Sequence, residues 1–156
     1  MSGSTTRLDR LNRRLLAELQ QDARLSLAEL GRRVGLSTPA VTERMKRLES
    51  QGVIRAYRAE LDAHSMGYPV TAFVRLYIPP DVYPKVEALL ASWPEVREAH
   101  HVTGDAAFVL KVVTRSLADL EALLARFTPF GRSETSVVLS TRLAPRPLPV
   151  EGGEEA

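Results

Sequence analysis

Hydrophobic residues recur at helical spacing through the first third of the chain, in three consecutive blocks. In the first block, residues 8–21, leucines fall on one stripe of a helix, and Asp9 precedes most of them as an N-cap. The stripe comprises Leu8, Leu11, Leu15, Leu16 and Leu19. This pattern predicts an amphipathic helix that supports the two helices after it.

The second block predicts a helix of only about two turns. Ser26 and Glu29 have the spacing of a capping box, in which the hydroxyl caps the first turn and the carboxylate reaches back to the cap N–H. Gly35 can adopt the left-handed conformation that ends a helix. The buried stripe is expected to comprise Leu27, Leu30 and Val34.

The third block predicts another capped helix, over residues 38–50. Ser37 supplies the N-cap, Pro39 falls in the first turn, where its missing N–H would have no helical partner, and Gly52 is placed to end the helix. Its buried stripe comprises Val41, Met45 and Leu48. Two short capped helices that meet at a glycine turn are typical of a DNA-binding helix-turn-helix.

The polar face of the third helix carries side chains that can bind base edges and phosphates. The alternative is an ordinary solvated helix face, which any single amphipathic helix would show. Because this helix follows a capped helix and a glycine turn, the pattern favours DNA binding. The expected contacts are Ser37, Thr38, Pro39, Thr42, Glu43, Arg44, Lys46 and Arg47.

Beyond Gly52 the pattern changes to strands alternating with helices. Residues 53–61 suggest a strand or a wing-like hairpin leading out of the first domain. The order after them is β-α-β-β-α-β, which predicts a ferredoxin-like unit with two helices on one face of a four-stranded antiparallel sheet. The expected strands are residues 70–78, 96–102, 106–114 and 133–143, and the expected helices are capped by Asp81 and by Ser116 with Asp119.

The fold class is therefore α+β: an N-terminal winged helix-turn-helix followed by a ferredoxin-like βαββαβ domain. The open face of such a sheet must be covered, and a second copy of the same sheet would cover it, so we expect a homodimer. The expected boundaries are an arm at residues 1–7, a DNA-binding domain at 8–61, a linker at 62–69, the ferredoxin-like domain at 70–143 and an extended or disordered tail at 144–156, with Leu148 and Val150 as contacts to a partner subunit.

Charge and composition agree with this organisation. Residues 1–60 hold 12 Lys and Arg against 7 Asp and Glu, whereas residues 61–156 hold 9 against 12. Cations therefore cluster in the half that carries the helix-turn-helix, as nucleic-acid affinity requires. No apolar run of about 18 residues predicts a membrane span, and the N-terminus lacks a hydrophobic signal core, so we expect a cytoplasmic protein.

No catalytic, metal or cofactor site is predicted. The chain has no cysteine, which removes thiolate nucleophiles and cysteine-based zinc sites. His100 and His101 are adjacent in an expected strand, so their side chains point to opposite faces and cannot chelate one metal. Trp93 beside Pro94 is expected to pack over a helix end.

At this point the sequence resembles a known family. The run from Leu8 to Ile54, LDRLNRRLLAELQQDARLSLAELGRRVGLSTPAVTERMKRLESQGVI, is similar to the DNA-binding domain of the Lrp/AsnC (leucine-responsive/asparagine-responsive) regulators, and VTGD in a βαββαβ context resembles their effector-binding domain. The resemblance implies a transcriptional regulator that dimerises through its sheet, assembles further to tetramers or octamers, and binds an amino acid or related metabolite between dimers near the glycine hairpin.

The effector residues follow from this resemblance position by position. Gly104 and Asp105 match the family's glycine and following acid, and Phe108 matches a usual aromatic. Many members have a second acid where this chain has Ala107, and that carboxylate would pair with an amino acid's ammonium group. Gly104 and Asp105 can also be explained by turn chemistry alone. The implied effector-binding set is Thr103, Gly104, Asp105, Ala107, Thr135 and Ser136.

Three hypotheses remain at this level. The first is an effector-modulated transcription factor that binds double-stranded DNA as a dimer. The second is an enzyme, because some haem-pathway decarboxylases resemble the same two-domain arrangement. The third is an architectural DNA-binding protein that responds to no ligand, which the alanine at position 107 favours.

Overall fold

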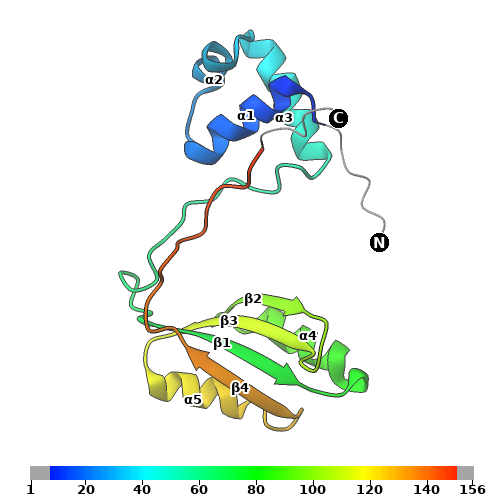
Figure 1. Ribbon diagram of the computed structural model, residues 1–156, viewed down its shortest axis with the longest axis vertical. Helices are drawn as coiled ribbons and strands as arrows, with labels where there is room; N and C mark the ends of the chain where they lie inside the picture. Colours follow the sequence, from blue (N-terminus) through cyan, green and yellow to red (C-terminus); the bar gives the residue numbers. More distant parts are fainter. Residues whose placement is uncertain (1–7, 151–156) are drawn as a thin grey trace. The chain divides into compact units, whose positions relative to one another are not determined.

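The computed structural model describes residues 8–150, so the expected arm at residues 1–7 and the end of the tail lie outside the described residues. The described chain forms two compact units. One comprises residues 8–59 together with residues 144–150, and the other comprises residues 60–143 (Figure 1).

The first unit contains three helices, and each N-cap residue predicted from the sequence is confirmed. Asp9, Ser26 and Ser37 each accept a backbone N–H from the first turn of the helix that they precede. The caps satisfy amides that have no partner within a helix, which fixes where each helix begins. The helices are α1 (Arg10–Gln21), α2 (Leu27–Val34) and α3 (Thr38–Ser50).

The core of this unit lies where the three helices meet. Its buried residues are Leu15, Leu30, Val34, Val41 and Met45. Leu27 was expected in the same stripe, but its side chain is 39% exposed. Leu27 is the first residue of α2, so it lies at the edge of this core although its direction around the helix is the expected one.

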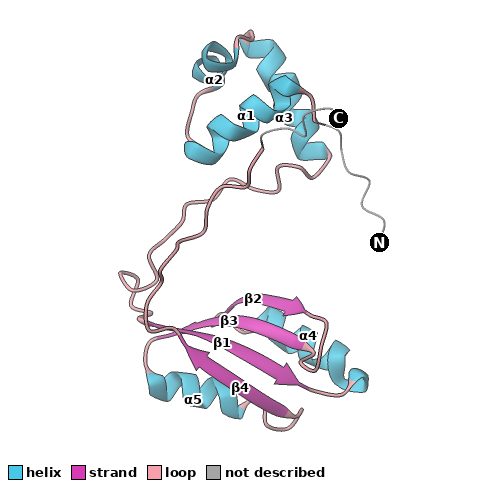
Figure 2. Cartoon of the chain, in the orientation of Figure 1, coloured by secondary structure: helices cyan, strands magenta, loops and turns pink. Residues whose placement is uncertain are grey.

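Residues 53–61 form no strand or hairpin, and Figure 2 shows them as loop. A strand needs a hydrogen-bonded neighbour, and the four strands of the sheet pair only with one another. Val53, Ile54 and Tyr57 prefer extended backbone locally. This preference does not make a strand here, because residues 53–61 have no strand to pair with among the described residues.

The second unit is a four-stranded antiparallel sheet in the order β2-β3-β1-β4, which confirms the ferredoxin-like topology (Figure 1). Ala72, Val74 and Leu76 on β1 are buried, while Phe73 and Arg75 between them are exposed. The buried face packs against both helices. The elements are β1 (Val70–Tyr77), a 3-10 turn (Pro80–Val82), α4 (Tyr83–Ser92), β2 (Val96–His101), β3 (Phe108–Thr114), α5 (Leu117–Ala125) and β4 (Arg132–Val137).

In this unit the cap of α4 and the end of β4 differ most from the sequence-based prediction, and the other strand ends differ by one or two residues. Asp81 does not cap α4, because it lies inside the 3-10 turn and the helix begins at Tyr83 without a side-chain cap. The last strand ends at Val137 rather than at residue 143. Its pairing with β1 stops where Val138 donates its N–H to Thr71, and the chain then leaves the sheet.

The tail returns to the first unit. The side-chain amide of Gln20 accepts from the backbone N–H of Leu148 at 2.7 Å and donates to its carbonyl at 2.9 Å. The backbone of Leu148 is thus held against α1 of its own chain, whereas its side chain is 76% exposed. The expected contact of Leu148 with a partner subunit stays a prediction. Residues 144–150 form no helix or strand.

Candidate nucleic-acid interface

The turn between α2 and α3 is set by a close approach of backbone atoms. Gly31 is buried within α2, and the N–H of Leu36 donates to its carbonyl at 2.9 Å. A Cβ at position 31 would lie 2.5 Å from the carbonyl oxygen of Leu36. Gly35 then takes φ of 75°, the left-handed conformation predicted for it, and Ser37 caps α3. These features fix the direction in which α3 leaves the turn.

One face of α3 is buried and the opposite face is open. Val41, Met45 and Leu48 pack inward as predicted, whereas Glu43, Lys46 and Arg47 are exposed. Among residues 8–150, neither Lys46 nor Arg47 forms an ion pair. Their charges are therefore available to phosphates, and the carboxylate of Glu43 can accept from the amino group of a cytosine.

The residues at the start of α3 are partly engaged within the helix. The hydroxyl of Ser37 caps the helix, and the hydroxyl of Thr42 donates to the carbonyl of Thr38 at 2.8 Å. Thr38 and Pro39 are exposed in the first turn. A hydroxyl that donates to its own backbone still has acceptor capacity, so these positions remain compatible with contact to DNA.

Arg44, which the sequence grouped with the DNA contacts, is bound to α1. Its Nη1 lies 2.6 Å from Oδ2 of Asp9 and 2.9 Å from the side-chain oxygen of Asn12. Asp9 also caps α1 by accepting from the backbone N–H of Asn12. The hydrogen bonds from Arg44 and Asn12 hold the pKa of the Asp9 carboxyl below its usual value. Arg44 therefore links α3 to the beginning of α1.

We expect Arg44 to act by positioning α3, and a double-mutant cycle tests this. Arg44→Met and Asp9→Asn should each destabilise the protein. The double variant should lose about 0.5–1 kcal/mol less free energy of unfolding than the sum of the two single variants. Either single change already breaks the partly exposed Arg44–Asp9 pair, so the second change has no pair left to break. Urea unfolding of the three variants measures the coupling. Strictly additive effects would show instead that the two side chains do not act together.

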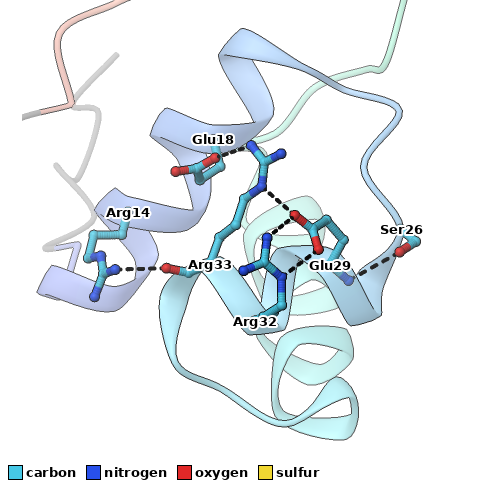
Figure 3. Close-up of polar contacts among 6 residues, drawn as sticks. All are labelled: Arg14, Glu18, Ser26, Glu29, Arg32 and Arg33. Atoms are coloured by element: carbon cyan, nitrogen blue, oxygen red, sulfur yellow. Dashed lines mark hydrogen bonds and ion pairs between the residues drawn. The ribbon is translucent and has the colours of Figure 1, made fainter.

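An ion-pair network joins α1 to α2 (Figure 3). Arg33 contacts Glu18 of α1 and Glu29 of its own helix, each at 2.8 Å, and Arg32 contacts Glu29 at 2.7 Å. Arg14 adds a hydrogen bond to the carbonyl of Arg33. The carboxylate of Glu29 was expected to reach back to the cap N–H, but it is occupied by the two guanidinium groups, which offer stronger charge-assisted bonds.

This network predicts a dependence of stability on pH. Hydrogen bonds from Arg32 and Arg33 lower the pKa of Glu29 to about 2. A carboxyl whose pKa is lower in the folded state stabilises it fully above its unfolded value, and this stabilisation is lost as pH falls toward the folded value. The stability difference between the wild type and Glu29→Gln should therefore be largest near neutral pH and shrink between about pH 4.5 and 2. Urea titrations across that range measure it. Glu121→Gln, an exposed change on α5, should show no such trend.

The expected effector residues do not form one cluster in this chain. Thr103, Gly104 and Asp105 are exposed in the turn between β2 and β3, where Gly104 has φ of 102°. Ala107 is only 5% exposed and belongs to the core, and its N–H donates to the carbonyl of Leu76. The side chain of Ala107 therefore does not reach the surface of the turn.

Thr135 and Ser136 are separated from that turn and from each other. They lie on β4, at the opposite edge of the sheet from β2. Thr135 pairs with Val74, so it shares the helix-covered face, whereas Ser136 pairs with Phe73 on the open face. The two side chains cannot line the same face of one chain.

An aromatic cluster beside the turn was not found from the sequence. Tyr83 of α4 lies with its ring centroid 5.3 Å from His101 and 5.2 Å from Phe108, and the rings of His101 and Phe108 are 5.3 Å apart. The three residues come from three elements, so no spacing along the chain indicates their contact. Trp93 is buried and packs against Phe127 as part of the core, in agreement with the packing role expected for it.

Within residues 8–150, no three acidic or histidine side chains converge as metal ligands. No helix in the described part of the chain is long and apolar enough to cross a membrane.

Comparison with known proteins gives matches to both units. A model of the AsnC-type helix-turn-helix domain matches residues 8–49, and a model of the Lrp/AsnC ligand binding domain matches residues 71–148. The chain is 33% identical to the HTH-type transcriptional regulator LrpC of Bacillus subtilis, over 86% of this chain and 93% of that protein. It is 40% identical to the leucine-responsive regulatory protein of Rhizobium meliloti, over 73% of this chain and 75% of that one.

Solved structures agree with the sequence comparison. The structure of LrpC from B. subtilis matches with a TM-score of 0.82, at 32% identity, and covers 86% of this chain and 96% of that one. A transcriptional regulator from Neisseria meningitidis, solved as a complex with L-Met, matches with a TM-score of 0.85 at 27% identity, over 92% of this chain and 97% of that one. These relatives are regulators, so they do not favour the decarboxylase-like alternative.

Proposed function

Because this chain belongs to the Lrp/AsnC family of transcriptional regulators, we propose that it controls transcription by placing α3 in the major groove of DNA. The observation that carries this proposal is the exposed face of α3, where Lys46 and Arg47 form no ion pair with any other described residue and the opposite face of the helix is buried in the core. The proposal assigns the contacts to Thr38, Pro39, Glu43, Lys46 and Arg47, and gives Arg44 the role of holding the helix in place. It includes no catalytic activity.

The second unit supplies the dimer in this proposal. Phe73, at the centre of the open sheet face, is 41% exposed, and Val109 and Val113 of the neighbouring strand are partly exposed on the same face. Arg75 and Glu134 form an ion pair at 3.7 Å beside them. A second copy of this mixed face would cover the apolar residues, and a dimer would present two recognition helices to two half-sites.

We further propose that a small metabolite regulates the protein at the turn between β2 and β3. The L-Met complex of the N. meningitidis regulator supports an amino acid as the class of ligand. In this chain Asp105 is the exposed carboxylate of the turn, and a carboxylate is the natural partner of an ammonium group, so Asp105 is the contact that we propose. Because position 107 is an alanine rather than an acid, Asp105 carries this role without a second carboxylate.

The proposal is tested by selecting bound sequences from a random DNA library with the purified full chain, with and without L-methionine. We expect an enriched motif with two-fold symmetry and half-sites about 10 base pairs apart or a multiple of that distance. A library that returns no motif would contradict sequence-specific regulation and leave only architectural binding.

L-methionine is expected to change DNA affinity or assembly state, and Asp105→Asn should abolish its effect. Sedimentation of the wild type and the variant, with and without L-methionine, measures the assembly state. Asp81→Asn, an exposed change in the 3-10 turn, is the matched control. An undiminished response in Asp105→Asn would remove the turn from the effector site.

A further inference from the structure

A cavity lies at the end of the sheet that is remote from the β2–β3 turn. It has a volume of about 380 Å³ and is formed where β3 ends and α5 begins. The six residue steps from Phe108 to Thr114 along β3 separate the cavity from the turn by about 20 Å, at about 3.3 Å per residue. Its polar lining residues are Tyr68, Glu95, Thr114, Arg115, Asp119 and Arg126. A cavity of this size is within the range of sites for small molecules.

Glu95 is the most unusual group in this cavity. Its Oε2 atom is buried, and among the described residues it has no hydrogen-bond partner. Its Oε1 atom lies 3.9 Å from Nη1 of Arg126, which is too far for a hydrogen bond. The guanidinium of Arg126 is instead stacked 3.8 Å over the ring of Trp93. A buried carboxylate oxygen without a donor is costly. Oε2 has almost no accessible surface, so a donor in the cavity would reach it only after the carboxylate of Glu95 rotates toward the cavity.

Arg115 provides the complementary charge. Its guanidinium lies 5.5 Å from the ring centre of Tyr68 and forms no ion pair with any residue in the range 8–150. The nearby carboxylate of Asp119 accepts from the hydroxyl of Ser116, and that hydroxyl also caps α5. One oxygen of Asp119 is therefore engaged at the helix cap, and Arg115, which forms no ion pair with Asp119, has donors to offer to an anion.

We propose that this cavity is a second ligand site, which binds a small zwitterion of amino-acid size through Glu95 and Arg115. The ammonium group donates to Glu95, and the carboxylate accepts from Arg115. Because the lining carries two acidic and two basic side chains, a ligand with no net charge fits it better than an ion of either sign. Ala122 and Leu123 line the rest of the cavity and leave room for a short aliphatic side chain.

A ligand bound at this site would also affect the turn at residues 62–69, which precedes β1. Tyr68, which stacks on Arg115, closes the turn at residues 62–69 by donating its N–H to the carbonyl of Ala63 at 2.8 Å. A ligand that fixes Arg115 would hold Tyr68 and slow the opening of this turn. Hydrogen exchange at the amides of Gly67 and Tyr68 therefore reports binding here independently of the β2–β3 turn.

The test is calorimetric titration of the full chain with L-alanine, L-valine, L-leucine and L-methionine, one at a time. For the amino acid that binds most tightly, the matched acid without the ammonium group and the matched amine without the carboxylate should each bind at least about tenfold more weakly. Glu95→Gln and Arg115→Met should each weaken the binding of that amino acid by a similar factor. Asp105→Asn removes the contact proposed at the β2–β3 turn, but it should leave unchanged the part of the binding that Glu95→Gln and Arg115→Met reduce, together with the slowed exchange of Gly67 and Tyr68.

Each other outcome overturns the proposal. If none of the four amino acids binds at concentrations up to about 10 mM, the cavity holds only water. The same conclusion follows if Glu95→Gln and Arg115→Met bind the amino acid as tightly as the wild type does. Binding that is lost in Asp105→Asn alone would place the ligand at the β2–β3 turn, which supports the regulation proposed above and removes this second site. Arg115 is exposed, so Arg115→Met retains the fold and decides the matter even if Glu95→Gln does not fold.

Discussion

Replacing Lys46 and Arg47 together by alanine is expected to weaken DNA binding at least about tenfold and to lower the salt dependence of the binding constant by about two counterions. Both side chains are exposed on α3, and neither pairs with another described residue. Each phosphate that a cation neutralises releases counterions, so the loss of two cations changes the slope of log K against log salt as well as the affinity. Fluorescence anisotropy on a selected DNA site, between about 50 and 200 mM salt, measures both quantities.

The matched control removes the same charge from the second unit. Lys85 of α4 and Arg97 of β2 are exposed, and Lys85→Ala with Arg97→Ala should leave the slope and the affinity nearly unchanged. Equal losses in the two double variants would mean that net charge, rather than the face of α3, determines binding. Both double variants should unfold at the same urea concentration as the wild type, since none of the four side chains belongs to a core.

Gly31→Ala is expected to destabilise the first unit by up to about 2 kcal/mol, although alanine favours a helix over glycine by about 1 kcal/mol. The new Cβ would lie 2.5 Å from the carbonyl oxygen of Leu36 and 3.4 Å from Cγ2 of Val41. The oxygen belongs to the backbone of the turn, so relief requires α2 and the turn to move apart, and overpacking of this kind costs about 1–3 kcal/mol. The steric term therefore exceeds the gain in helix propensity. Denaturant unfolding of the wild type and the variant measures the difference.

The same helix supplies the control for propensity. Ala28 is exposed on α2, so Ala28→Gly should cost about 1 kcal/mol from propensity alone, with no change in DNA affinity. Gly31→Ala should weaken DNA binding as well, because the turn sets the direction of α3. A Gly31→Ala variant more stable than the wild type would show that α2 can shift away from the turn without cost.

The helical half was predictable because its signals are local. Each N-cap hydroxyl or carboxylate acts on an amide within three residues, so Asp9, Ser26 and Ser37 could be assigned from spacing, and Gly35 from the conformation that only glycine adopts readily. The order of strands and helices in the second unit followed from the same kind of pattern. The end of β4 could not be predicted in this way, because it depends on where β4 stops pairing with β1.

The features of the candidate site can likewise be separated into those set by neighbouring residues and those set by contacts between distant elements. The sequence by itself determined which residues of α3 face outward and that the basic residues cluster in the helix-turn-helix half. It also determined the family, because periodicity, caps and motif letters are properties of neighbouring residues.

Only the tertiary structure decided that Arg44 holds α3 to Asp9 rather than standing free, that Glu29 joins an ion-pair network, that Ala107 is buried, and that Glu95 and Arg115 line one cavity. Each of these contacts joins residues from different elements or depends on burial by distant ones. Their energies arise from desolvation and from the geometry of groups that folding brings together, and no spacing along the chain encodes either.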